Sequence, residues 1–133
     1  MKTKKLGKKA RLPSLRALRA KLDRTFSLYI RGQAADARGM SNCVTCGVMK
    51  PWREFHAGHW IKRQFLATRY DDRNVHPQCV HCNLYRGGAL IEYTLFMQKT
   101  YGQDVVDELM RLKRTTVKHT RQDLEDMIRK YTP

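Results

Sequence analysis

The chain has 133 residues, which is enough for one compact domain but too few for two independent cores. Its 27 lysines and arginines outnumber 12 acidic residues, and the formal charge of +15 predicts a polyanionic partner, with nucleic acid first. An anionic membrane surface would also suit this charge, but no apolar run is long enough to span a bilayer, so we expect no membrane segment.

Residues 1–12 are predicted to form a basic, flexible arm. The segment has no acidic residue and offers little apolar surface to bury, so it should not fold alone. It could contact phosphates or serve only solubility. Because no apolar stretch follows the basic residues, we do not expect a secretory signal, and we expect a cytoplasmic protein.

The predicted single domain, residues 13–133, begins with a helix placed within residues 13–39. Pro13 is a favourable first helical residue, and Gly32 or Gly39 could end the helix. Its apolar stripe consists of Leu15, Leu18, Leu22, Phe26 and Tyr29. The opposite face is basic and would suit solvent as well as DNA.

Residues 40–95 are predicted to form a core built on zinc. They contain two C-x2-C pairs, which are Cys43 with Cys46 and Cys79 with Cys82. In a reducing compartment this spacing is typical of a four-thiolate zinc site rather than of two disulfides. Four protein ligands leave no open position on the ion, so we expect this zinc to be structural.

Residues 40–83 lack sustained helical periodicity, which predicts short strands and loops around the metal. We expect a small apolar core there, formed by Trp52, Phe55, Trp60, Ile61, Phe65 and Tyr70.

Helical periodicity returns after Cys82 and continues through the predicted C-terminal helices at residues 96–133. The first helix should bury Leu84, Ile91 and Leu95 and end at Tyr101-Gly102. The next should bury Val105, Val106, Leu109 and Met110. The last has Thr120 as a candidate N-cap and a stripe of Leu124, Met127, Ile128 and Tyr131.

Four of the five histidines lie inside or close to the cysteine-bounded segment: His56, His59, His76 and His81. A lone histidine is more often a packed or surface residue than a reactive one, and taken separately this is our expectation for His56, His76 and His81. A histidine could also replace a cysteine as a zinc ligand.

Two runs of sequence carry a family resemblance: A-G-H at residues 57–59 and R-Y-D-D-R-N-V-H-P-Q-C-V-H-C-N at residues 69–83. They resemble HNH nucleases of the ββα-metal (His-Me finger) type and, more closely, the phage NinG/Rap recombination proteins. The resemblance covers about residues 40–110. It implies an α+β fold with a small zinc-anchored ββα-metal core packed with flanking α-helices. It further implies a metal-dependent endonuclease that cuts branched recombination intermediates, such as Holliday junctions and D-loops, in the bacterial host of a phage.

The same resemblance implies roles for particular residues. His59 stands at the position of the general base, Asn83 at that of a ligand to a catalytic magnesium or manganese ion, and Asn74 at that of the residue that holds the loop facing the base. Gly58 departs from the pattern, because many HNH nucleases have an aspartate ligand there. Candidates for the missing ligand are His56, which is our choice, and Asp71, Asp72 and Glu92. The ion could also rely on Asn83, phosphate oxygens of DNA and water.

Five basic residues crowd the same segment and are predicted to contact the DNA backbone, although surface solubility would also explain them: Lys62, Arg63, Arg69, Arg73 and Arg86. Two symmetric strand cuts would call for a homodimer. The alternative to a nuclease is a zinc-stabilised nucleic-acid-binding module without catalysis, and a third possibility is an RNA-binding, ribosome-associated zinc protein.

Overall fold

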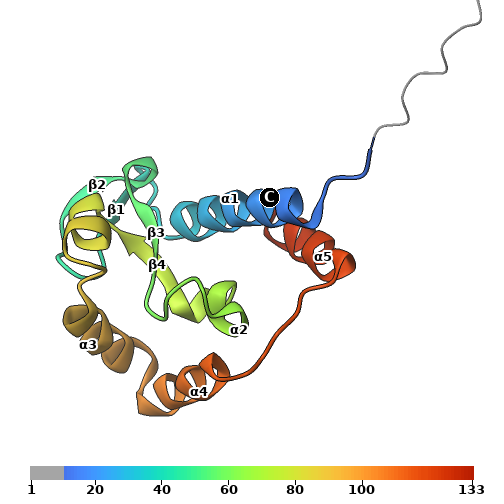
Figure 1. Cartoon of the computed structure of the whole chain (residues 1–133). Coiled ribbons are helices and arrows are strands. Elements are labelled where there is room, and N and C mark those ends of the chain that lie inside the picture. Colours follow the sequence, from blue (N-terminus) through green and yellow to red (C-terminus); the bar gives the residue numbers. More distant parts are fainter. Residues whose placement is uncertain (1–10) are drawn as a thin grey trace, which may run out of the picture.

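The computed structural model describes residues 11–133, so most of the predicted arm at residues 1–12 lies outside the described part. Two small antiparallel hairpins lie among helices, which confirms the predicted α+β class (Figure 1). No helix in the described range is long and apolar enough to cross a membrane.

The first helix, α1 (Leu15–Gln33), starts later and ends earlier than residues 13–39 allow. Ser14 is the N-cap, and its side chain accepts a hydrogen bond from the amide of Ala17, so Pro13 lies before the helix. The helix ends at neither Gly32 nor Gly39, because the chain leaves it at the C-cap Ala34. The buried stripe is Leu18, Leu22, Phe26 and Ile30. Leu15 is exposed, and Ile30 takes the place expected for Tyr29 because the stripe follows four-residue steps.

The two hairpins follow α1. Strands β1 (Met40–Asn42) and β2 (Met49–Pro51) pair antiparallel, and the short helix η1 (Trp52–Glu54) comes next. Strands β3 (His56–His59) and β4 (Val75–Gln78) form the second pair, in which His59 lies opposite Val75. Between them the chain forms α2 (Leu66–Arg69) and η2 (Asp72–Asn74). A short π-helix, η3 (His81–Tyr85), follows β4.

Three helices complete the chain: α3 (Leu90–Tyr101), α4 (Gln103–Lys113) and α5 (Arg121–Tyr131). Helix α3 ends at Tyr101 with Gly102 as its C-cap, and Thr120 caps α5 in a capping box with Asp123, as the sequence predicted. Helix α5 packs against α1, and α1 also contacts both strands of the β3–β4 hairpin (Figure 1).

The prediction of a buried apolar face after Cys82 is wrong. Leu84, Ile91 and Leu95 are 59%, 77% and 61% exposed, and α3 buries Tyr93 and Met97 instead. The prediction assumed one helical phase across the segment, but Gly87, Gly88 and Ala89 all have positive φ and separate η3 from α3. Met110 in α4 is also exposed, whereas Val106 and Leu109 are buried.

The described residues bury three apolar clusters. The largest joins α1 and α5 to Tyr70 and Val75, and the second joins Trp60 and Ile61 to α3 and α4. The third surrounds the cysteines and includes Phe55. Most of the predicted apolar core of the zinc segment is therefore buried, whereas Trp52 stays partly exposed beside two arginines.

Candidate functional site

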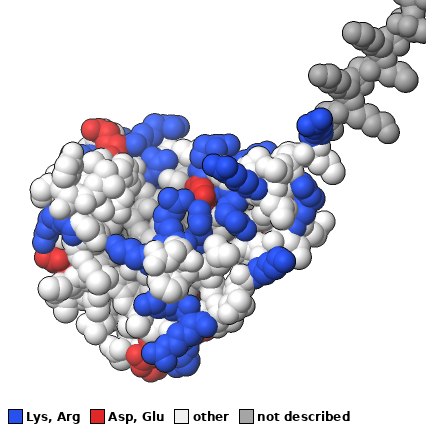
Figure 2. Space-filling view, in the orientation of Figure 1, with Lys and Arg blue, Asp and Glu red and all other residues white. Residues whose placement is uncertain are grey.

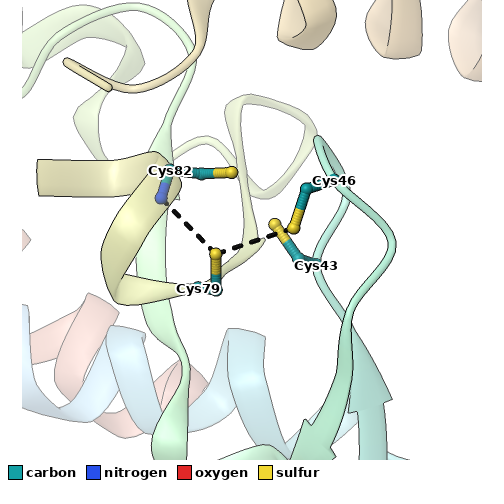
Figure 3. Close-up of side chains that lie close together, drawn as sticks. All are labelled: Cys43, Cys46, Cys79 and Cys82. Carbon is teal, nitrogen blue, oxygen red and sulfur yellow. Dashed lines mark hydrogen bonds between the residues drawn. The ribbon is translucent and has the colours of Figure 1, made fainter. Parts of the chain in front are cut away.

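The four cysteines gather at one point between the two hairpins (Figure 3). Cys43 and Cys46 come from the turn after β1, while Cys79 and Cys82 come from the end of β4 and from η3. Their sulfur atoms all lie within 4.8 Å of one another, and the Sγ atoms of Cys46 and Cys79 are 3.7 Å apart. Thiolates at ~2.3 Å from a tetrahedral zinc ion stand ~3.8 Å apart, so this cluster could bind zinc.

Nearby donors also suit thiolates at this cluster. The backbone amide of Cys82 donates to the sulfur of Cys79 at 3.4 Å, and the hydroxyl of Thr45 lies 3.3 Å from the sulfur of Cys43. Such hydrogen bonds stabilise the charge that metal-bound sulfur carries. Among the described residues the cluster contains no histidine, so the cysteines form a closed set of four.

A separate cleft of ≈ 600 Å³ opens beside the cysteine cluster, between α1 and the start of β3. We call it the cleft throughout. Its polar and charged lining residues are Asp23, Arg24, Ser27, Arg31, Arg53, His56, His59, Arg63 and Asn83. Three residues predicted to carry chemistry, namely His56, His59 and Asn83, therefore share one hollow although they come from β3 and η3.

His59 is the last residue of β3 and is partly buried in the cleft. Its Nε2 lies 2.9 Å from the backbone oxygen of Arg69. A carbonyl oxygen only accepts hydrogen bonds, so Nε2 carries the proton and Nδ1 keeps a lone pair. Burial, aided by the charges of Arg63 and Arg69, lowers the pKa of His59 to about 4. The imidazole is therefore neutral at pH 7, which is the state that accepts a proton.

Asn74 ties together the two ends of the loop that carries Arg69. Its side chain is fully buried; Oδ1 accepts from the amide of Ile61 at 2.8 Å, and Nδ2 donates to the carbonyls of Ile61 and Thr68 at 3.0 and 3.1 Å. Since Ile61 follows His59 closely and Thr68 precedes Arg69, these bonds fix the loop against the histidine. Asn74 does not line the cleft, so its contribution is to geometry.

Asn83 and His56 meet across the cleft. The side-chain amide of Asn83 lies 3.1 Å from Nδ1 of His56. A half-turn of this amide exchanges its nitrogen and oxygen, so the pair can also present one oxygen and one imidazole nitrogen to a cation. The other candidates for a second ligand, Asp71, Asp72 and Glu92, do not line the cleft.

Packing explains why position 58 carries no carboxylate. A Cβ atom at Gly58 would lie 2.7 Å from Cδ of Gln78 and closer still to its Oε1. Gln78 is fully buried, and its Nε2 donates to the carbonyl of Gly88 at 2.8 Å and to the hydroxyl of Thr45 at 3.2 Å. An aspartate at position 58 would have to displace this buried side chain.

Asp23, on α1, brings a carboxylate to the cleft that sequence reasoning did not single out. Arg69 donates to it from Nε at 3.1 Å and Nη2 at 2.6 Å, and Tyr70 donates at 2.7 Å. Arg63 adds a third contact at 3.1 Å. Burial raises the pKa of Asp23, but the hydrogen bonds from Arg69 and Tyr70 together lower it by more. The net pKa of Asp23 is therefore below its ordinary value. Asp23 thus holds the residue whose carbonyl contacts His59.

Of the five basic residues predicted to contact DNA, only Arg63 lines the cleft. Arg69 is engaged by Asp23, and Arg73 by Asp71 and Glu108 at 2.8 Å each. Arg86 pairs with Glu92, and Lys62 donates to the carbonyl of Gly87 at 2.9 Å, both at exposed positions. The cleft instead contains Arg24, which belongs to the basic helix face that would suit solvent as well as DNA, and Arg31 and Arg53, to which the sequence pattern assigned no site.

The remaining histidines of the segment lie outside the cleft. His76 is held between the hydroxyls of Tyr93 at 2.9 Å and Tyr101 at 2.7 Å, and burial lowers its pKa to about 4. Tyr93 in turn donates to the carbonyl of Gly58 at 2.7 Å. His81 is exposed beside Tyr85. Both agree with the packed or surface positions that we expected.

Comparison with known proteins places the chain in a family. The family model described as bacteriophage Lambda NinG protein matches residues 1–133. The chain belongs to the NinG family. Protein ninG of Escherichia phage lambda is 34% identical to it, and Protein ninG of Escherichia phage 933W is 35% identical, each over 68 residues.

Each of these NinG matches covers 50% of the chain but only 33% of the relative. The chain is therefore aligned with about a third of the length of these curated relatives. No solved structure matches the chain. The predicted kinship with phage NinG proteins is confirmed, whereas the HNH assignment stays a prediction.

Proposed function

We propose that this NinG-family protein is an HNH-type, divalent-metal-dependent DNA endonuclease. One observation carries the proposal: His59, His56 and Asn83 line one cleft, with the lone pair of a neutral His59 imidazole left available. In the proposed reaction, Nδ1 of His59 accepts a proton from the water that attacks phosphorus. The Arg69 carbonyl keeps the ring in the required tautomer.

Magnesium or manganese is the proposed cofactor of the cleft, and His56 and Asn83 would hold it. Their donor atoms, an imidazole nitrogen and an amide oxygen, are ligands that manganese accepts readily, while magnesium prefers the oxygen. When bound, the ion would stabilise charge on the phosphate and on the leaving 3′ oxygen. The four cysteines are proposed to hold a structural zinc ion that fixes η3, and with it Asn83, beside β3.

The proposed substrate is branched DNA from recombination, such as Holliday junctions or D-loops. This part of the proposal is supported by the sequence resemblance to NinG/Rap recombination proteins. Two symmetric cuts in a four-way junction would require two copies, so we propose that a homodimer acts on the junction. Sedimentation with and without junction DNA measures the number of copies bound.

Cleavage assays test the nuclease directly. Linear, nicked and four-way DNA are incubated with magnesium, manganese or a chelator, using the wild-type protein, His59→Ala and His81→Ala. We expect metal-dependent cleavage of the four-way DNA, a loss of about 10²- to 10⁴-fold in His59→Ala, and little change in His81→Ala, whose exposed ring lies outside the cleft. Undiminished cleavage by His59→Ala would contradict its role as the base.

A second candidate function is a DNA-binding module that cuts nothing, and Gly58 favours it. The packing of Gln78 against Gly58 leaves no room for a carboxylate ligand at this position. DNA binding without cleavage under any divalent ion would support the module over the nuclease.

A further inference from the structure

Two arginines of the cleft, Arg31 and Arg53, come from different elements and have no acidic partner among the described residues. Arg31 lies in the last turns of α1, and Arg53 lies in η1. Both line the same cleft as His59 and Asn83. The one carboxylate that lines this cleft, Asp23, is already bound by Arg63 and Arg69. The charges of Arg31 and Arg53 are thus left uncompensated.

The backbone holds Arg31 in place and leaves part of its guanidinium free. Nε donates to the carbonyl and hydroxyl of Ser27 at 3.2 and 3.0 Å, and Nη1 donates to the carbonyls of Arg53 and Phe55 at 3.3 Å each. These bonds occupy Nε and Nη1. The two N–H groups of Nη2 have no partner within residues 11–133, so they can bind a ligand in the cleft.

Arg53 is held by stacking rather than by hydrogen bonds. Its guanidinium lies 4.4 Å from the ring centroid of Trp52, and that of Arg31 lies 5.6 Å from the same ring. Trp52 therefore brings two cations together, and both burial and the charge of Arg53 lower the pKa of Arg31. Like charges at close range repel, and an anion bound between them would relieve this repulsion.

We propose that Arg31 and Arg53 form a subsite for a backbone phosphate of DNA, on the strand that enters the cleft. The inference rests on the proposed function for the identity of the ligand. A fork of N–H donors fits phosphate oxygens, and a preorganised Arg31 loses little side-chain entropy on binding. Lysine and arginine side chains gather over α1 (Figure 2), the helix that lines one side of the cleft, so the strand would approach a basic surface.

The test measures binding alone, so it does not depend on cleavage. Arg31→Gln and Arg53→Gln are made in the His59→Ala protein, and affinity for a labelled four-way junction and a linear duplex is measured in chelator at several salt concentrations. Each substitution should lower affinity about tenfold and reduce the slope of log affinity against log salt by about 0.9. If the wild-type protein cuts no DNA, this result still stands, so the two proposals fail separately.

Arg111→Gln is the matched control. Arg111 is exposed on α4, lies outside the cleft and loses the same charge when replaced. The subsite is overturned if Arg53→Gln weakens DNA binding no more than Arg111→Gln does. Arg53 makes no side-chain hydrogen bond in the described chain, so its variant should fold even if Arg31→Gln does not.

Discussion

Gly58 shows how one residue limits the chemistry of a site. Its place before His59 is the one where a carboxylate ligand would be expected from the HNH resemblance. The side chain of Gln78 fills the space beside it, and Gln78 Oε1 itself has no hydrogen-bond partner among the described residues. An unpaired buried oxygen is costly, so Gln78 is held there by its other bonds and by tight packing. An aspartate introduced at position 58 would therefore disturb the packing of β3 against β4, and this would prevent it from acting as a metal ligand.

A double-mutant cycle between Gly58 and Gln78 tests this packing. Gly58→Ala should lower the free energy of unfolding by about 1 to 3 kcal/mol, because the new methyl group overlaps the Gln78 side chain. In the Gln78→Ala background, the same change at Gly58 should cost almost nothing. Urea unfolding of the four proteins measures the coupling. Equal costs in both backgrounds would show that Gln78 is not the obstacle.

Gly32→Ala is the control for the glycine change itself. A Cβ at Gly32 would meet Trp52 at 3.7 Å, an ordinary contact, and the residue lies within α1. Alanine has the higher helix propensity, so this substitution should be neutral or stabilise the protein by up to about 1 kcal/mol.

His76 should make stability depend on pH. Its folded pKa, about 4 because of burial, lies below the unfolded value of about 6.5. The unfolded chain therefore binds more protons between these values, so the stabilisation is complete above pH 6.5 and is lost as pH falls toward 4. We expect His76→Gln to reduce the loss of unfolding free energy between pH 7 and pH 5 by about 2 kcal/mol.

Urea unfolding at both pH values measures this effect. His59 has a similarly lowered pKa, so some acid sensitivity should remain in His76→Gln. His81→Gln, a change at an exposed ring, should leave the acid loss as it is in the wild-type protein. Identical pH profiles for the two variants would contradict the buried, neutral state of His76.

Among the elements, α1 acts as a wall of the cleft as well as a core helix. Its apolar stripe packs on α5 and the β3–β4 hairpin, while Asp23 on another side holds Arg69. The Arg69 carbonyl contacts His59, so two hydrogen bonds connect α1 to the histidine: one between the Arg69 side chain and Asp23, and one between His59 and the Arg69 carbonyl. The helix is thus coupled to a site that lies more than thirty residues away in sequence.

Asp23→Asn tests the coupling of α1 to the loop. The change removes the charge opposite Arg69, whose side chain is 15% exposed, and should cost about 2 kcal/mol of stability. Asp36→Asn is the control, because Asp36 pairs with an Arg38 side chain that is 71% exposed, and should cost clearly less stability. Equal costs measured by chemical denaturation would show that the Asp23 contact is only a surface pair.

The sequence predicted those elements that local signals determine. Thr120 as a cap, Tyr101-Gly102 as a helix end and the cysteine pairs depend on near neighbours, and the structure has them all. The predicted burial of Leu84, Ile91 and Leu95 is wrong, because the turn at residues 87–89 changes the helical phase. The sequence pattern singled out neither Arg31 nor Arg53, since only the packing of α1 against η1 brings them together.

At the scale of the whole molecule, the described chain lacks one continuous core. One apolar cluster joins α1 and α5 to Tyr70 and Val75, and another joins α3 and α4 to Trp60 and Ile61. The third consists mainly of Cys43, Cys79 and Cys82 with Phe55 and Ala89. Cysteine and alanine are small and bury little apolar area each, so the region that joins the two hairpins depends on what binds the sulfur atoms. Asn83 lies next to Cys82 and His56 next to Phe55, so this region also sets one side of the cleft.

Zinc removal should therefore unfold the hairpin region and disrupt the cleft with it. We expect one zinc ion per purified chain, and a cobalt-substituted protein whose absorption indicates four thiolate ligands. A chelator should abolish the cooperative unfolding transition of the hairpin region, and adding zinc back should restore it. Cys46→Ser should have the same effect although Cys46 is exposed, because losing one of four ligands opens the site. A metal-free protein with an unchanged transition would show that the cysteines pack without an ion, and the proposed positioning of Asn83 by zinc would then fail as well.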